Sequence, residues 1–224
     1  MLSKLVNWGR YASILGGLLF GVAVVLHPLR DGISIFNSGV AYPIIHDLGV
    51  FGLMFQLFGL VGLYIREAEA MGNRGQISFI VVFFAQLFYI LLLVVDGAVN
   101  SVLSIYDIKL VHATSVAGVD PRLSINLFLI GLPALVLFFL GYILFGASLL
   151  SAKVQPRLGS LLITIGAPIY IIGGINIFIL GPASPIVSVI EIAGAIPLAL
   201  GYVLLGLKLR SGVSMQVSQA SYSD

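Results

Sequence analysis

Six long runs of apolar residues alternate with short polar segments along the chain. The runs cover residues 11–29, 42–65, 76–106, 124–150, 158–180 and 185–207. Each is long enough to cross a hydrocarbon core about 30 Å thick as a helix, in which the backbone satisfies its own hydrogen bonds. Stretches such as FIVVFFAQLFYILLLVV lack the alternation of barrel strands. The pattern predicts an all-α polytopic membrane protein, a bundle of six transmembrane helices.

Composition agrees with this interpretation. Of 224 residues, 59% are hydrophobic and 9% are charged, and the mean hydropathy is +1.13. Lys4 and Arg10 precede the first run as in a signal peptide, but no small-x-small cleavage pattern follows it, so we expect a retained span. Residues 1–210 then form a single transmembrane domain, and the polar residues 211–224 are expected to be a disordered cytoplasmic tail.

The basic residues predict how the chain sits in the cell membrane. One set of short connections carries eight of them: Lys4, Arg10, Arg66, Arg74, Lys153, Arg157, Lys208 and Arg210. The other set carries three: Arg30, Lys109 and Arg122. Because positive charge is retained on the cytoplasmic side, both termini are expected there, and residues 30–41 and 107–123 face outward.

The sequence argues against nucleic-acid binding and thiolate-bound cofactors, and it contains no recognisable catalytic motif. The net charge is only +2 and the charges are spread thinly, so nucleic acid is not an expected partner. The chain has no cysteine, so no cofactor can be held by thiolate ligands. No nucleophile, zincin or phosphate-loop motif occurs, so catalytic residues are unknown and enzyme activity stays undecided.

Ionisable side chains of four predicted helices fall at one depth. Counted at about 1.5 Å per residue from the basic end of each run, His27, His46, Asp96 and Glu191 lie roughly 25–33 Å away, and Asn176 lies in the same layer. That layer is the outer hydrocarbon boundary. Gln56 and Gln86 are the main polar side chains at mid-depth.

His27 and His46 form the most specific constellation. One interpretation is a pair of imidazoles that bind haem b or a metal ion, with Asp47 or Asp96 as a further ligand or orienting acceptor. The metal ligands would be His27, His46 and Asp96. The other interpretation is that both histidines cap helices at the interface. If the first two helices pack tightly, they cannot hold a haem between them.

Other polar residues raise further alternatives. His112, in an outer loop, could supply a haem ligand or be solvated. Asp96 and Asn100 share a helix face and could bind a quinone carbonyl or join a helix-end network. Glu191 is an isolated acid on an apolar helix, which makes it a functional candidate unless it simply faces Asn176.

The glycines are expected to form helix contacts, and the tyrosines near the run ends are expected to lie at the membrane interface. Gly49, Gly52, Gln56 and Gly59 form a smooth stripe that predicts a close helix contact. The segments LGYILFG (140–146), LGYVLLG (200–206) and the looser FGLVGLYIR (58–66) suggest three repeated helical hairpins. Trp8 and the tyrosines near run ends were assigned to an interfacial aromatic belt: Tyr11, Tyr42, Tyr64, Tyr106 and Tyr202.

The chain resembles a family of small six-span bacterial and archaeal membrane proteins of unassigned function. The shared elements are Gly17 to Gly21, Leu26-His27-Pro28, His46, Gly59 to Arg66 and Asp96-Gly97, over about residues 12–210. The resemblance implies six helices and a grouping of His27, His46 and Asp96, but no activity. Cytochrome b561-type proteins differ, because they place histidine pairs on four central helices and the last four runs here contain none.

Three functions follow as hypotheses. The first is a redox-associated respiratory membrane subunit that uses His27 and His46, supported by Asp47 and Asp96, to bind haem b or a metal near a quinone. The second is a permease for a small solute or for protons, lined by Glu191, Asp96, Gln56 and Gln86. The third is a structural subunit of a larger membrane complex or a homo-oligomer, with glycine stripes as its contact surface. All three place the chain in a lipid bilayer.

Overall fold

Five α-helices make up nearly all of the chain that the structure, a computed structural model, describes: residues 2–27, 41–99, 102, 121–180 and 184–209. They are α1 (Leu2–Leu26), α3 (Ala41–Val94), α6 (Pro121–Ala152), α7 (Arg157–Leu180) and α8 (Pro185–Leu209), and a short π-helix, η1 (Val95–Val99), continues α3. These residues contain no strand, which confirms the all-α prediction. Each α-helix contains a segment long and apolar enough to cross a membrane.

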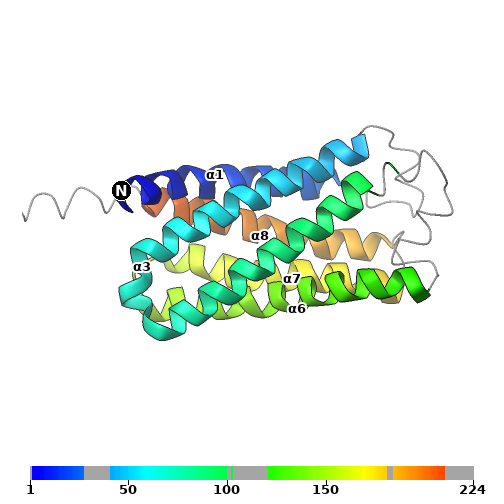
Figure 1. The fold of residues 1–224 in the computed structure, drawn as a ribbon. Helices are drawn as coiled ribbons and strands as arrows, with labels where there is room; N and C mark the ends of the chain where they lie inside the picture. Colours follow the sequence, from blue (N-terminus) through cyan, green and yellow to red (C-terminus); the bar gives the residue numbers. More distant parts are fainter. Residues whose placement is uncertain (1, 28–40, 100–101, 103–120, 181–183, 210–224) are drawn as a thin grey trace, which may run out of the picture.

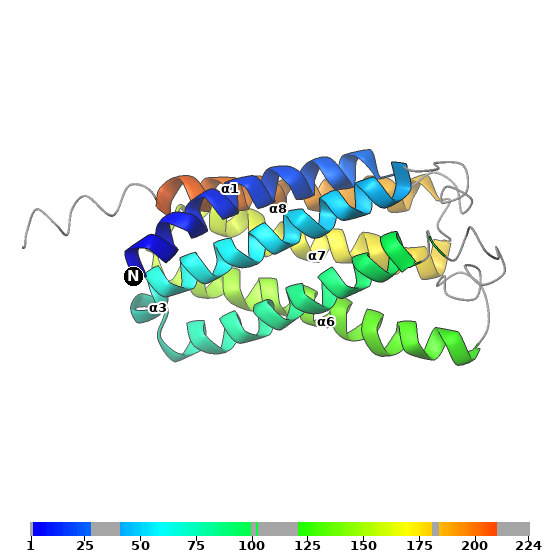
Figure 2. The same ribbon diagram turned by 45° about the horizontal axis from the view of Figure 1, so that its top comes forward.

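The predicted count of six helices is wrong for the described chain, because the second and third predicted spans are joined in α3. The segment Glu67–Met71 between them consists of strong helix formers, so helix continues up to Gly72. Gly72 has φ 58° and ψ −157°, a backbone conformation that favours glycine. There α3 folds back, and its first arm (41–71) and second arm (73–94) lie side by side (Figures 1 and 2).

Helix ends differ from the expected spans mainly in the first half of the chain. α1 begins at Leu2 rather than residue 11, because polar residues such as Lys4 and Asn7 extend a helix without adding to hydropathy. It ends at Leu26, two residues before Pro28, which disfavours helical backbone at the residue before it. The second arm ends at Val94 rather than 106. α6, α7 and α8 begin and end within three residues of the predicted spans.

The helices close into a ring. α1 packs against both α3 and α8, α8 packs against α7, α7 against α6, and α6 against α3. The end of α8 lies beside the start of α1, since Gly206 packs on the Arg10 carbonyl (Figure 1). Side chains that point into the ring are therefore shielded on all sides by other helices.

Backbone contacts through glycine hold α1 against the first arm of α3. A Cβ atom added to Gly9 would lie 2.7 Å from Gly62 Cα, one at Gly16 would lie 2.5 Å from Gln56 N, and one at Gly52 would lie 2.6 Å from Phe20 N. Helices can approach this closely only where a side chain is missing. The stripe predicted at Gly49, Gly52, Gln56 and Gly59 is confirmed as this contact.

The repeated motif marks the same kind of contact three times. A Cβ at Gly59 would lie 2.9 Å from Ser13 Cα, one at Gly141 would lie 2.8 Å from Val82 Cα, and one at Gly201 would lie 3.0 Å from Ile163 N. In each case the glycine is on the second helix of a pair and packs on the first. The residues that follow these glycines, Leu60, Tyr142 and Tyr202, are all buried. The chain is therefore three successive helical pairs.

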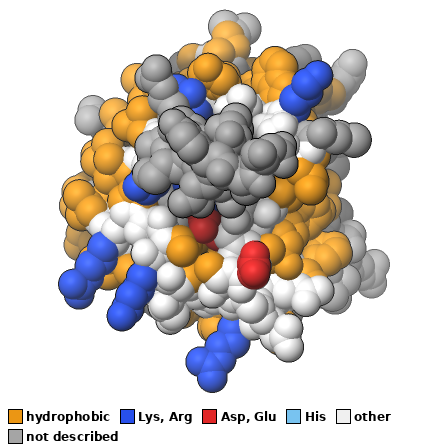
Figure 3. Space-filling view, turned by 90° about the vertical axis from the view of Figure 1, so that its left-hand side faces the viewer, with side chains coloured by type: hydrophobic (Ala, Val, Ile, Leu, Met, Phe, Trp, Pro, Cys, Tyr) orange, Lys and Arg blue, Asp and Glu red, His pale blue; other side chains and the backbone are white. Residues whose placement is uncertain are grey.

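One end of the bundle carries the Lys and Arg side chains that the structure describes, and we name it the basic end. It contains the start of α1, the turn at Gly72, the connection between α6 and α7 and the end of α8 (Figure 1). Lys and Arg side chains stand around the rim of this end (Figure 3). The opposite end contains the end of α1, the start of α3 and η1, and we name it the histidine end.

Candidate functional site

His27 lies directly after α1 at the histidine end. Its backbone N–H donates to the Val24 carbonyl at 3.3 Å, so the last turn of the helix carries the ring to the edge of the bundle. The Nε2 atom points at His46, and the Nδ1 atom is buried without a hydrogen-bond partner among the described residues. The position of Pro28 in the sequence explains why the helix stops here.

Tyr42 and His46 lie one turn apart at the start of α3, on the same face of the helix. His46 is 2% exposed, and its Nδ1 atom is 2.9 Å from the Tyr42 carbonyl oxygen. The two rings also pack together, with centroids 4.2 Å apart. A carbonyl oxygen only accepts hydrogen bonds, so this contact assigns the hydrogen of a neutral His46 to Nδ1.

Asp96 reaches the same place from η1. A π-helical turn inserts an extra residue into a helix and is frequent at functional sites. The next residue, Gly97, makes the approach feasible, because a Cβ atom there would collide with the Cβ of His46. The side chain of Asp96 is 44% exposed, whereas that of His46 is 1% exposed.

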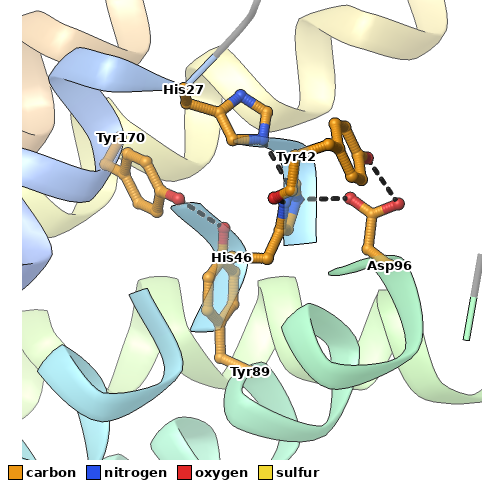
Figure 4. Close-up of polar contacts among 6 residues, drawn as sticks. All are labelled: His27, Tyr42, His46, Tyr89, Asp96 and Tyr170. Atoms are coloured by element: carbon orange, nitrogen blue, oxygen red, sulfur yellow. Dashed lines mark hydrogen bonds and ion pairs between the residues drawn. The ribbon is translucent and has the colours of Figure 1, made fainter. Parts of the chain in front are cut away.

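These four residues form the histidine–aspartate cluster (His27, Tyr42, His46 and Asp96; Figure 4). His46 Nε2 is 3.1 Å from His27 Nε2 and 3.2 Å from Asp96 Oδ2. The Tyr42 hydroxyl donates to Asp96 Oδ1 at 3.1 Å. Tyr42 therefore orients both neighbours, His46 through its carbonyl and Asp96 through its hydroxyl.

The contacts of His46 require one more proton than a neutral His46 and an ionised Asp96 supply. With its hydrogen on Nδ1, a neutral His46 offers only a lone pair at Nε2, and an ionised Asp96 offers only lone pairs as well. Two lone pairs at 3.2 Å repel each other unless a proton lies on His46 Nε2 or on the carboxyl group. His27 Nε2 competes for the same atom, so the proton has three neighbouring sites.

A haem does not fit between the two histidines. It would have to separate two rings that are in direct contact, with centroids 4.7 Å apart. The glycine contacts between α1 and α3 leave no room for a macrocycle either. A metal ion needs ligand atoms around one point, and in the described part of the chain no three His, Asp or Glu side chains are grouped in that way. Cofactor binding stays a prediction.

A second polar contact lies deeper in the bundle. The Tyr89 hydroxyl, on the second arm of α3, donates to the Tyr170 hydroxyl of α7 at 2.9 Å (Figure 4), and we call these residues the tyrosine pair. Glu191 of α8 is 8% exposed and interacts electrostatically with both tyrosines. A Cβ atom added to Gly173 of α7 would lie 2.5 Å from Glu191 Cγ. The missing side chain at this glycine therefore makes room for Glu191.

A third polar group occupies the middle of the ring. Gln86 Nε2 is 2.6 Å from the Tyr142 hydroxyl, 3.1 Å from the Tyr202 hydroxyl and 3.4 Å from Gln56 Oε1. The two hydroxyls are 2.8 Å apart, and Gln56 donates to the Gly16 carbonyl at 3.2 Å. We call Gln56, Gln86, Tyr142 and Tyr202 the central cluster. All four are at most 1% exposed, and Gln86 Oε1 has no partner among the described residues.

The predicted residues meet only in part. His27, His46 and Asp96 lie together, and so do Gln56 and Gln86. Asp47 is exposed and outside the cluster. Asn176 donates to the Ile172 carbonyl of its own helix at 2.7 Å, so it gives no support to the expected pairing with Glu191. Asn100 and His112 lie outside the described residues.

Sequence reasoning missed five tyrosines. Tyr42 and Tyr202, assigned to an interfacial belt, are buried in polar clusters, and that assignment is wrong for them. Tyr89, Tyr142 and Tyr170 were not singled out. The available signals were the spacing of Tyr42 and His46 by four residues and the tyrosine shared by the two LGY motifs.

Known proteins add nothing to this assignment. No family model, no curated protein and no solved structure matches the chain. The resemblance to a six-span family therefore stays a prediction, and the functional argument depends on the geometry of the described residues.

Proposed function

We propose that the protein is a membrane permease that conducts protons through the interior of its helix ring. The observation that carries the proposal is the histidine–aspartate cluster, in which His46 Nε2 lies within hydrogen-bonding distance of both His27 Nε2 and Asp96 Oδ2. Groups that pass protons in membrane proteins are typically His, Asp and Glu side chains in the interior of a bundle.

The distribution of side chains supports a membrane setting. Large apolar residues are exposed along the helices, among them Phe58 (63%), Ile77 (63%) and Ile165 (53%), whereas Gln56 and Gln86 are fully buried. An apolar surface, together with polar side chains that are kept in the interior, suits a protein surrounded by lipid, because lipid cannot hydrogen-bond to exposed polar groups. We take each arm of α3 as one crossing, which gives six crossings in total.

The charge distribution supports an orientation. The Lys and Arg residues whose side chains the structure describes all belong to the basic end. By the positive-inside rule this end is cytoplasmic, with both ends of the described chain, and the histidine end is extracytoplasmic. Protons would then enter at Asp96, whose side chain is partly exposed.

The interior offers groups to carry a proton onward. Below the histidine–aspartate cluster lie the tyrosine pair and Glu191, and then the central cluster. Hydroxyl groups can accept and donate at the same time, so they relay protons, and Glu191 can bind one. Tyr89 and Gln86 lie three residues apart on the same arm of α3, which brings the two levels within one helical turn.

Proton flux into liposomes tests this proposal. Purified protein is reconstituted around a pH-sensitive dye, and a potassium gradient with valinomycin drives proton entry. We expect wild-type vesicles to acidify faster than protein-free vesicles, Asp96→Asn to remove most of the difference, and Asp47→Asn, an adjacent exposed control, to retain it. His46→Gln provides a second test should Asp96→Asn fold poorly. Wild-type vesicles as tight as empty ones, or full flux in both cluster variants, would contradict the proposal.

Glu191, a buried acid, can be tested independently in the same flux experiment. Glu191→Gln removes a buried ionisable group that interacts with both members of the tyrosine pair, so we expect flux to fall. Glu69→Gln, an exposed acid near the turn at Gly72, is the matched control and should behave as wild type. Unchanged flux in Glu191→Gln would remove that residue from the path while leaving the cluster in it.

No contact among the described residues favours a quinone, a partner subunit or a redox role, and those hypotheses stay predictions from the sequence.

A further inference from the structure

We infer that Phe138 is an apolar barrier that separates the tyrosine pair from the central cluster and limits proton flow between them. This inference rests on the proposed proton conduction. It adds the residue that limits the rate of this conduction.

The position of the ring carries the inference. Phe138 of α6 is fully buried, and its ring centroid is 4.7 Å from that of Tyr89 and 4.6 Å from that of Tyr142. Its centroid is 6.4 Å from that of Tyr170. A single phenyl ring therefore touches a member of each polar group, and it has no atom that can relay a proton.

The repeat gives Phe138 one polar and one apolar equivalent. Three side chains occupy equivalent positions in the three helical pairs: Gln56, Phe138 and Leu198. Each lies three residues before the glycine of the repeated motif. All three are fully buried. Two of these positions are apolar, and the third, Gln56, has its amide bonded to the Gly16 carbonyl and near Gln86. Phe138 is the largest of these three side chains.

Removal of the ring should admit water. Phe138→Ala deletes a volume that exceeds the roughly 30 Å³ that one water occupies in the liquid, and the site has polar groups on both sides to bind it. Phe145→Ala is the matched control, since Phe145 is fully buried on the same helix, beyond Tyr142. Phe138→Val keeps more of the packing and serves as the second variant should the alanine variant fold poorly.

Two readouts separate this inference from the proposed function. The chain has no cysteine, so Gln86→Cys supplies a single reporter for a small membrane-impermeant thiol reagent. We expect the reporter to be unreactive alone and with Phe145→Ala, and to be labelled with Phe138→Ala or Phe138→Val. In a background with Gln86 intact, Phe138→Ala should raise liposome proton flux several-fold above wild type.

The outcomes are distinct. A reporter that reacts equally with and without Phe138, or that stays unreactive in both Phe138 variants, overturns the barrier whatever the flux. Labelling that depends on Phe138, with no proton flux in wild type or in Phe138→Ala, supports the barrier to water and overturns the proposed function. Labelling and flux that both increase only when Phe138 is removed support both.

Discussion

The histidine–aspartate cluster and the central cluster are both held by several helices, yet they differ in chemistry and in surroundings. The first contains three ionisable groups, two imidazoles and a carboxyl group, and one of them, Asp96, is partly exposed. The second contains only amides and phenols, all at most 1% exposed. The histidine–aspartate cluster can therefore change its charge, whereas the central cluster stays neutral in an interior shielded from water.

This difference separates function from folding. Hydrogen bonds between neutral groups in the centre of the ring tie α3, α6 and α8 together and need not change during a working cycle. The described contacts of the cluster at the histidine end join α1, α3 and η1, and they depend on the protonation of His46 and Asp96. We therefore expect changes in the central cluster to reduce stability and changes in the histidine–aspartate cluster to alter proton handling.

The largest effect should come from the helix contact on which both clusters depend. Gly16→Ala places a Cβ atom 2.5 Å from Gln56 N and 2.8 Å from the Gly52 carbonyl oxygen, so α1 must move away from α3. We expect a loss of about 1–3 kcal/mol in unfolding free energy, measured by thermal or denaturant unfolding in detergent.

Gly49→Ala is the matched control for that contact. Its added Cβ would meet only side-chain atoms, Leu93 Cδ1 at 3.4 Å and Ala23 Cβ at 3.6 Å. We expect stability close to wild type. Equal stability of the two variants would mean that α1 does not pack on α3 through Gly16.

The next largest effect is expected in the central cluster. Gln86→Leu leaves the Tyr142 and Tyr202 hydroxyls with only each other, and it removes the partner of Gln56 Oε1. We expect a loss of about 1–2 kcal/mol, and a lower midpoint of thermal unfolding in detergent. The exposed Gln76→Leu on the same arm should have little effect. A Gln86→Leu protein as stable as the control would show that the cluster does not hold the helices.

The smallest effect on stability should come from Tyr42→Phe. This change removes one hydrogen bond, to Asp96 Oδ1, but keeps the backbone carbonyl that orients His46. We expect a loss of about 0.5–1 kcal/mol in unfolding free energy together with slower proton flux. Tyr11→Phe, at an exposed tyrosine of α1, is the control for both measurements. Flux equal to wild type would assign Tyr42 a packing role only.

Much of the fold could be predicted from hydropathy. Apolar runs located all the helices, and the ends of α6, α7 and α8 were predicted within three residues. Hydropathy could not show that the segment Glu67–Met71 stays helical, since a polar segment is equally compatible with a loop. The backbone at Gly72 shows that the chain reverses there, between the two arms of α3.

The sequence predicted the depth of the site residues in the membrane but not the direction in which their side chains point around each helix. Counting residues from the basic end placed His27, His46 and Asp96 at one level, and they meet there. A depth count does not give the direction of a side chain around its helix, so it grouped His46 with its neighbour Asp47, which points to a different side. The tyrosines were missed because they contribute to apolar runs like any aromatic residue, although their hydroxyls need partners when buried.

The central claim is that His46 shares a proton with Asp96 and His27. The nitrogen-15 NMR spectrum of the histidine rings in the reconstituted protein tests it most directly, and the chain has only three histidines to assign. We predict hydrogen on Nδ1 of His46, and an Nε2 resonance that shifts more in Asp96→Asn than in Asp47→Asn, whose exposed carboxylate acts on His46 as a nearby charge. A His46 with Nδ1 unprotonated, or an Nε2 resonance that is identical in wild type and Asp96→Asn, would contradict the account.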